Sequence, residues 1–448
     1  MTIFSTLYYL LNEKHVSFPI KMKYQFYLLL LVVSCESLCP DESIAQSGNT
    51  DTLERIVFSV HEGAADNQWD PWSWPKTDAL FNGDFLYWGT TSSTGYGGIA
   101  EFNTVTKSFK TYDIKQSRIV DDHNNTCVRA IRDNKLVVGF ATGHDQDAIL
   151  HLRIAIIKQN TIEFYNAGDI EFPGVLSYCQ IIEKAGKYYI FTRVRDCKWM
   201  YITTEDFMSY STPKPFIESD LQYYIFMADI TDESDMVRVA MYSNPEYIDD
   251  NIRLGYIDFK TGSVYDADAT TEISKLGECF IASSNFSVVI SNENNSYNQR
   301  LWDLARTTKS EVSIAFTRYK TYNDGEYYVY HNGTTAKVCG AGTAYWLPKV
   351  QNGVCFTNEE ELVVAREDNG TDYIELWKRK GDTWGFDKCI YKDTRGDSGT
   401  NRQIKPIFND CGYVIWLNGY HSLDDYYHFK AHAMVYDLNT TALYSGGN

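Results

Sequence analysis

The chain has 448 residues, of which 59 are Asp or Glu and 41 are Lys or Arg, giving a formal net charge of −18. Hydrophobic residues make up 44% and aromatic residues 15%, enough for a large core, which excludes a disordered chain. Binding to nucleic-acid phosphates depends on clustered Lys and Arg. The sequence has no such cluster, so we expect no nucleic-acid partner.

The first 46 residues have the character of a targeting sequence. Two lysines precede the apolar run Phe26–Val33, which is too short to span a membrane and has the length of a signal-peptide core. We expect cleavage after Ala45 or Gln46 and secretion; lipid anchoring at Cys35 is the alternative. No other run approaches the length of a membrane-spanning helix, so we expect no transmembrane span.

Eight of the ten cysteines lie beyond this targeting sequence. They are Cys127, Cys179, Cys197, Cys279, Cys339, Cys355, Cys389 and Cys411. Disulfides are permitted in a secreted chain, but the spacing of cysteines does not determine their pairing.

Short runs of alternating hydrophobic and polar residues dominate the chain from about residue 55 onward. Examples are Lys135–Phe140, Lys187–Thr192 and Tyr413–Leu417, and turn pairs such as Asn82-Gly83 and Asp324-Gly325 separate the runs. No long segment shows helical spacing. The sequence therefore predicts an all-β chain.

The runs group into units of about 40–50 residues, a period typical of β-propellers. The predicted blades are 72–114, 121–172, 175–219, 223–270, 298–340, 345–394 and 401–438. We therefore predict one domain, 47–448, that forms a seven-bladed β-propeller with four-stranded antiparallel blades around a central channel; six or eight blades are the alternatives. We expect Glu54–Val60 to supply the outer strand that closes the last blade, and most aromatic side chains to pack between blades.

Function in a propeller concentrates where the inner strands and their loops surround the channel. Four polar residues of the second and third predicted blades fall at such places: His123, His144, Tyr178 and Arg193. A single His is more often a hydrogen-bonded structural residue than a catalytic one. The recurrence of these residues at equivalent blade positions favours a common site.

These residue types suit elimination across a uronic acid. The planar, permanently charged guanidinium of Arg193 matches a carboxylate and can stabilise the negative charge that builds on it. A His or Tyr can take the proton from C5, and a second such group can protonate the leaving oxygen. Hydrolysis of glycosides usually needs two separated carboxyl groups, whereas Asp121 and Asp122 are adjacent and would alternate faces on a strand.

Several motifs resemble the BNR-repeat propeller proteins that include secreted ulvan lyases, placed in polysaccharide lyase families 24 and 25. The motifs, within residues 60–438, are Trp72-Ser-Trp, Val120-Asp-Asp-His-Asn-Asn, Ala141-Thr-Gly-His, Leu150-His-Leu-Arg-Ile, Gly353-Val-Cys-Phe and Trp416-Leu-Asn-Gly-Tyr. The resemblance implies a seven-bladed lyase that cleaves a rhamnose-3-sulfate–uronic acid linkage. It implies that a His/Tyr set moves the protons and that an Arg neutralises the uronate, roles that fall on His123, His144, Tyr178 and Arg193.

The chain departs from the pattern of these lyases in the fourth blade. An Asp-Gly-His-Pro run is common there, but this chain reads Tyr242-Ser-Asn-Pro. We expect five residues to bind substrate: Asn124, Asn125, Arg153, Tyr242 and Asn244. Related propellers include rhamnosidases and rhamnose–glucuronate lyases, so these activities, or a non-catalytic carbohydrate-binding role, are the alternatives.

The resemblance also allows a structural zinc ion in the later blades, and we expect no cofactor for catalysis. The available ligands are Cys279, Cys339 and Cys355 with His421 or Cys411. Three thiolates and one imidazole would suit a closed tetrahedral site. Buried free thiols or a disulfide are equally compatible with the spacing.

The sequence thus predicts a secreted, monomeric polysaccharide lyase whose partner is an anionic, sulfated, uronate-containing polymer. The net negative charge is an average over the whole surface and does not exclude this partner. Binding depends on the channel, where Arg193 and Arg153 can create a local positive potential.

Overall fold

The computed structural model describes sixteen segments, which all belong to one compact unit, Ala45–Asn448. They are residues 53–62, 68–69, 79–92, 95–114, 126–131, 134–141, 146–158, 161–195, 197–243, 251–292, 297–320, 324–342, 353–393, 400–402, 407–422 and 429–446. The predicted signal peptide and Cys35 lie outside them. Within these segments no helix is long and apolar enough to cross a membrane.

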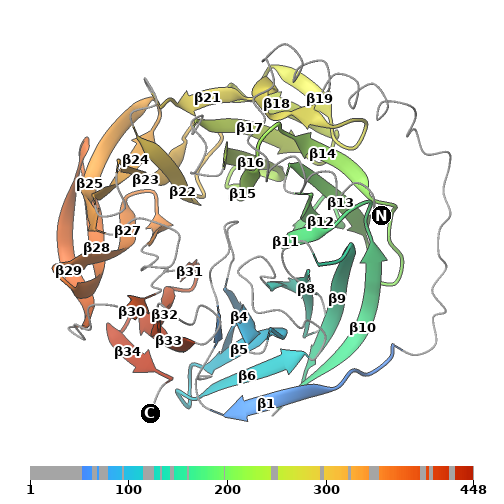
Figure 1. The fold of residues 1–448 in the computed structure, drawn as a ribbon, viewed down its shortest axis with the longest axis horizontal. Coiled ribbons are helices and arrows are strands. Elements are labelled where there is room, and N and C mark those ends of the chain that lie inside the picture. The colour runs from blue at the N-terminus through green and yellow to red at the C-terminus, as the bar shows by residue number, and fades with distance from the viewer. Residues whose placement is uncertain are drawn as a thin grey trace, which may run out of the picture. The chain divides into compact units, whose positions relative to one another are not determined.

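The described residues form seven sheets that follow one another around a ring (Figure 1), which confirms the predicted seven-bladed propeller. Blade 1 contains β1 (Phe58–Glu62), β2 (Gln68–Trp69), β3 (Leu80–Asn82), β4 (Phe85–Ser92), β5 (Gly97–Asn103) and β6 (Phe109–Ile114). Blade 2 contains β7 (Cys127–Ile131), β8 (Lys135–Phe140), β9 (Ile149–Ile157) and β10 (Ile162–Glu171). Blade 3 contains β11 (Leu176–Lys184), β12 (Lys187–Val194), β13 (Lys198–Thr204) and β14 (Lys214–Glu218).

The remaining four blades have the same antiparallel order. Blade 4 contains β15 (Tyr223–Ile230), β16 (Glu233–Ser243), β17 (Ile252–Asp258), β18 (Ser263–Asp266), β19 (Glu272–Lys275) and β21 (Ser287–Ile290). Blade 5 contains β22 (Asn298–Leu304), β23 (Ser313–Tyr319), β24 (Gly325–His331) and β25 (Thr334–Gly342). Blade 6 contains β26 (Gly353–Asn358), β27 (Glu361–Asp368), β28 (Thr371–Lys380) and β29 (Thr383–Asp393). Blade 7 contains β30 (Thr400–Arg402), β31 (Ile407–Asn409), β32 (Tyr413–Ser422), β33 (Phe429–Asp437) and β34 (Ala442–Ser445).

The segment between β19 and β21 of blade 4 links two blades. Its short strand β20 (Ile281–Ala282) pairs in parallel with β14 of blade 3, and the single-turn 3-10 helix η1 (Ser283–Asn285) leads back to β21 in blade 4. Residues that the predicted blades left unassigned therefore tie the outer strands of blades 3 and 4 together.

The ring closes differently from the sequence prediction. The strand β1 pairs with β6 and so adds an outer strand to blade 1, with Val60 opposite Tyr112. The outer strand of blade 7 is β34, which pairs with β33 beyond the predicted end of that blade. The expectation that Glu54–Val60 closes the last blade is therefore wrong, because the C-terminal residues Ala442–Ser445 already occupy that edge.

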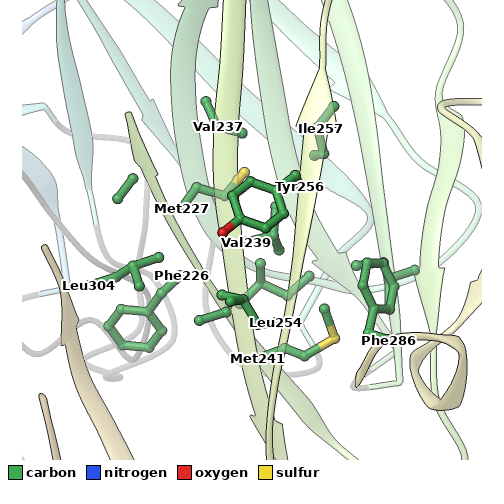
Figure 2. Packing of buried hydrophobic residues seen from close by; sticks show 14 of the residues in the cluster. Phe226, Met227, Val237, Val239, Met241, Leu254, Tyr256, Ile257, Phe286 and Leu304 are labelled. Atoms are coloured by element: carbon green, nitrogen blue, oxygen red, sulfur yellow. The ribbon is translucent and has the colours of Figure 1, made fainter. Parts of the chain in front are cut away.

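Apolar side chains fill the spaces between neighbouring blades. The middle strands are buried on both faces, as in β12, where every residue after Lys187 is buried. Figure 2 shows this packing in blade 4, where Phe226 of β15 lies beside Leu304 of the next blade. Another cluster joins Trp88 of blade 1 to Val435 of blade 7, so hydrophobic packing also joins the first blade to the last.

Candidate functional site

The predicted site residues Tyr178 and Arg193 lie on the first two strands of blade 3. The inner strand β11 carries Tyr178 near its start, and β12 carries Arg193 near its end. The ladder pairs Ser177 directly with Arg193. Antiparallel pairing thus brings together two side chains that are fifteen residues apart in the sequence.

A β-bulge orients Tyr178. The ladder register shifts between Ser177 and Gln180, so Tyr178 lies within the irregular part of β11. Its φ is 62°, and it is the one non-glycine residue with positive φ inside a described strand; the others lie in turns and connections. Such a backbone costs about 1–3 kcal/mol and persists only where the surroundings enforce it. Here the hydroxyl of Thr192 donates a hydrogen bond to the carbonyl oxygen of Tyr178 over 2.8 Å.

The guanidinium of Arg193 lies against aromatic rings from two blades. Its central carbon is 4.6 Å from the centroid of the Tyr178 ring and 5.1 Å from that of Tyr224 in blade 4. The Tyr178 ring also stacks with Trp199, with ring centroids 6.5 Å apart, and the indole N–H of Trp199 donates to the backbone oxygen of Tyr223 over 3.1 Å. Cation–π attraction and this packing hold Arg193 at the boundary between blades 3 and 4.

Aromatic and cationic groups continue from this point into blades 4 and 5. Tyr224 stacks on the predicted substrate-binding residue Tyr242 with ring centroids 5.2 Å apart. Burial raises the pKa of the Tyr242 phenol, and the positive charge of Arg300 on β22 partly opposes that increase. The guanidinium of Arg300 in turn lies 4.0 Å from the centroid of the Trp302 ring.

We refer to this set of side chains as the Arg–Tyr array, which consists of Tyr178, Arg193, Tyr224, Tyr242 and Arg300. Its members come from three consecutive blades and are at most 2% exposed. Two of them, Tyr224 and Arg300, were not found from the sequence. The position of Arg300 in its strand could have identified it, because Arg300 is the third residue of the inner strand β22 and Tyr178 is the third residue of the inner strand β11.

Five predicted residues lie outside the described residues: His123, His144, Asn124, Asn125 and Asn244. In the sequence, the two histidines flank the β7–β8 hairpin of blade 2, four residues before Cys127 and four after Phe140. Their roles and those of the three asparagines stay predictions.

The structure places Arg153 away from the Arg–Tyr array. It lies on β9, the third strand of blade 2, is 0% exposed, and forms an ion pair with Asp169 over 2.8 Å. It also donates hydrogen bonds to the side-chain oxygen of Asn166 over 2.9 Å and to the carbonyl oxygen of Gly168 over 3.1 Å. These contacts lie within blade 2, and the expectation that Arg153 binds substrate stays a prediction.

The predicted zinc ligands that the structure describes come from separate places along the ring of blades. Cys279 is exposed after β19, Cys339 is on β25 of blade 5 and Cys355 is buried on β26 of blade 6, while the side chain of His421 is not described. Among the described side chains no three of His, Cys, Asp and Glu gather as a metal-binding group. The structural zinc ion stays a prediction.

Fold and site together define a seven-bladed β-propeller with a buried arginine–tyrosine array on the first two strands of blades 3 and 4 and the first strand of blade 5. The fold is similar to that of solved polysaccharide lyases. An ulvan lyase of polysaccharide lyase family PL25 has a TM-score of 0.59 at 10% identity, over 85% of this chain and 96% of that chain.

Two further solved lyase structures match the chain at similarly low identity. One is the PL25 ulvan lyase bound to -[GlcA(1-4)Rha3S]-, with a TM-score of 0.58 at 10% identity over 85% of this chain and 96% of that chain. The other is the polysaccharide lyase Uly1, with a TM-score of 0.53 at 11% identity over 81% and 89%. No family model and no curated protein matches the sequence. At this sequence identity, the structural similarity shows that the fold is shared.

Proposed function

We propose that this protein is a polysaccharide lyase that cleaves a sulfated, uronate-containing polymer of the ulvan type by β-elimination. The observation that carries the proposal is Tyr178, whose left-handed backbone inside a strand turns its ring onto the guanidinium of Arg193. Strained backbone of this kind is concentrated at functional sites. Solved structures with the same fold include ulvan lyases, one of them bound to a glucuronate–rhamnose-3-sulfate fragment.

Arg193 supplies the electrostatic part of the proposed reaction. The C5 proton of a uronate is weakly acidic, and its removal places negative charge on the neighbouring carboxylate. A guanidinium matches a carboxylate with two parallel N–H donors and keeps its charge at any working pH. A fixed donor inside a site with low dielectric constant stabilises such developing charge far more than water does.

The electron and proton movements then involve three groups. A base takes the C5 proton, the electron pair of that C–H bond forms the C4–C5 double bond, and the bond from C4 to the leaving oxygen breaks. An acid protonates that oxygen, which leaves as the new chain end. We assign Tyr178 to one of the two proton transfers and His123 or His144 to the other.

The complete burial of Tyr178 and Arg193 sets a condition on this mechanism. Both are 0% exposed, so a sugar reaches them only when binding uncovers the start of β11. Binding energy from the sugar units on either side of the reacting uronate is then used to open the site.

The second cation of the array, Arg300, suits the sulfate of the same polymer. It lies in the neighbouring inner strand beyond Tyr242, and a planar guanidinium binds sulfate oxygens as it binds carboxylate. Arg193 on the second strand of blade 3 and Arg300 on the first strand of blade 5 would therefore give this part of the ring a local positive potential despite the net charge of −18. Export of the chain, as its N-terminal sequence predicts, would bring it to such a polymer.

The direct test follows absorbance near 235 nm while the protein is incubated with ulvan, because β-elimination creates an unsaturated uronate. A steady increase is expected, and parallel incubations with desulfated ulvan and with an unsulfated polyglucuronate measure the contribution of the sulfate. A flat absorbance with release of reducing ends would indicate a hydrolase. Binding without any new chain ends would indicate a non-catalytic carbohydrate-binding propeller, and either result would overturn the proposal.

A further inference from the structure

Two cysteines meet at the boundary between blades 2 and 3. Cys127 is the first residue of β7, and Cys179 lies in the bulge of β11, next to Tyr178. Both side chains belong to one apolar cluster, in which Cys179 is 4% exposed and Cys127 is half-buried. Both are free thiols in this structure.

Gly139 relates the positions of the two cysteines. It is directly opposite Cys127 in the ladder between β7 and β8. Directly paired residues point to the same face, with Cβ atoms about 4.5–5.5 Å apart. A Cβ at Gly139 would lie 2.7 Å from the sulfur of Cys179. The sulfur of Cys179 therefore fills the space that a side chain at Gly139 would take, beside the side chain of Cys127.

We propose that Cys127 and Cys179 form a disulfide that joins blade 2 to blade 3 when the chain folds in an oxidising compartment. A disulfide requires Cβ atoms about 3.5–4.5 Å apart, and the missing side chain at Gly139 allows the two cysteines to approach. The predicted export of the chain would take it to a compartment where such bonds persist. The existence of the bond does not depend on the proposed lyase activity.

The oxidant is the disulfide of a thiol–disulfide oxidoreductase or of oxidised glutathione. The sulfur of the more exposed Cys127 loses its proton, attacks one sulfur of the oxidant and releases the other as a thiol. The sulfur of Cys179 then loses its proton and displaces the oxidant from Cys127. Two protein thiols have lost two protons and two electrons, and one disulfide of the oxidant has become two thiols.

Burial determines when the bond forms. Burial of Cys179 and its contact with Cys127 raise the pKa of the Cys179 thiol well above its usual value. A buried, protonated thiol reacts slowly because the thiolate is the nucleophile. The bond therefore forms during folding, as the packing of blade 3 against blade 2 brings the two thiols together while the oxidant can still reach them.

The position of the bond has a consequence that rests on the proposed function. Cys179 directly follows Tyr178 in the bulge, and Cys127 begins the strand that follows the His123 segment in the sequence. The disulfide would hold β7 and the bulge of β11 in fixed register and so keep Tyr178 in its strained backbone conformation.

The test is peptide mapping of the full chain after refolding in a mixture of reduced and oxidised glutathione. Remaining thiols are blocked with N-ethylmaleimide in denaturant, and the chain is digested without reduction. We expect one peptide pair linked through Cys127 and Cys179, while Cys355, equally buried but in blade 6, carries the label. Reduction should remove the link and lower the midpoint of thermal unfolding by about 3–5 °C.

Three variants test whether folded geometry produces the link. Cys127→Ser and Cys179→Ser should each leave the other cysteine labelled. Gly139→Ala places a methyl group where the Cys179 sulfur lies and should slow linkage at least about tenfold, while circular dichroism reports the folded state. The proposal would be overturned if both cysteines of the refolded wild-type chain carried the label, or if either cysteine were linked to another partner. An unchanged rate of linkage in Gly139→Ala would also overturn it. None of these readouts depends on cleavage of a polysaccharide.

Discussion

Two buried arginines in neighbouring blades occupy opposite kinds of surroundings. Arg153 of blade 2 and Arg193 of blade 3 are both 0% exposed. Arg153 lies on a third strand and is held by the carboxylate of Asp169 and by oxygen atoms of its own blade. Arg193 lies at the end of a second strand, against the ring faces of Tyr178 and Tyr224 from two blades.

The comparison shows that partners and place in the blade, rather than burial or residue type, indicate the role of a buried arginine. A guanidinium paired with a carboxylate inside one sheet stabilises that sheet, because its removal would leave a carboxylate without its partner. A guanidinium between the aromatic rings of two inner strands lies where a propeller places its ligand sites. Replacement of Arg193 should therefore lower turnover more than stability, and replacement of Arg153 should lower stability more than turnover.

Replacement of Arg193 should have the largest effect. In Arg193→Ala the cation beside the proposed carboxylate is lost, and turnover of ulvan should fall by about 10³-fold. Arg193→Lys keeps the charge without the planar fork and should recover part of the rate. The measurement is the initial increase in absorbance near 235 nm. Near-wild-type turnover in Arg193→Ala would remove Arg193 from the reaction.

Tyr178→Phe tests the neighbouring group of the same array. It keeps the ring under the guanidinium and removes the hydroxyl, so turnover should fall by about 10²–10³-fold if that hydroxyl moves a proton. The matched control is Tyr327→Phe, which removes a buried phenol that donates to the backbone oxygen of Ala365 over 2.7 Å at the boundary between blades 5 and 6. The control should lose about 1 kcal/mol of stability and keep its rate. Equal turnover rates for Tyr178→Phe and Tyr327→Phe would show that the Tyr178 hydroxyl takes part in neither proton transfer.

Arg153→Met should give the opposite result from Arg193→Ala. The side chain keeps much of its volume but loses its charge and donors, which leaves Asp169 and Asn166 without this partner. The free energy of unfolding in urea should fall by about 2–4 kcal/mol, with the turnover per folded molecule unchanged. A loss of turnover that exceeds the loss of folded protein would instead support the predicted role of Arg153 in substrate binding.

The number of blades could be predicted because alternation and turn pairs are local properties of the sequence. The way the ring closes could not be predicted, because an edge strand such as β1 can pair with either of two adjacent blades. Tertiary contacts determine which pairing forms. Contact between Tyr178 and Arg193 was predictable from their places at the ends of paired strands. The bulge that gives Tyr178 its positive φ leaves no clear sequence signal, since no glycine marks it.

The contacts of Arg153 within blade 2 could not be predicted for a similar physical reason. The sequence correctly places Arg153 on a strand, but the position of its partners depends on a second bulge, between Asn166 and Gly168 of β10. That irregularity brings an amide oxygen, a carbonyl oxygen and a carboxylate to one guanidinium. Side-chain partners of this kind arise from three-dimensional register, which periodicity alone does not report.

The smallest expected effect is a pH dependence of the free energy of unfolding that comes from Asp169, the partner of Arg153 in blade 2. Burial alone would raise the pKa of Asp169, but the hydrogen bond from His151 and the charge of Arg153 outweigh it and lower this pKa to about 2. A carboxyl group whose pKa is lower in the folded chain than its unfolded value of about 4 stabilises the fold above pH 4. That contribution should be lost as the pH falls from about 4 to about 2.

Asp169→Asn should remove this part of the acid dependence and cost about 1–2 kcal/mol at neutral pH, a moderate value because the carboxylate is 39% exposed and screened by solvent. Urea unfolding at pH 3, 4 and 7 measures the difference between wild type and variant, which should shrink toward the lowest pH. The variant should turn over ulvan at the wild-type rate at pH 7. A difference that does not change with pH would mean that the ion pair between Asp169 and Arg153 is not what stabilises blade 2.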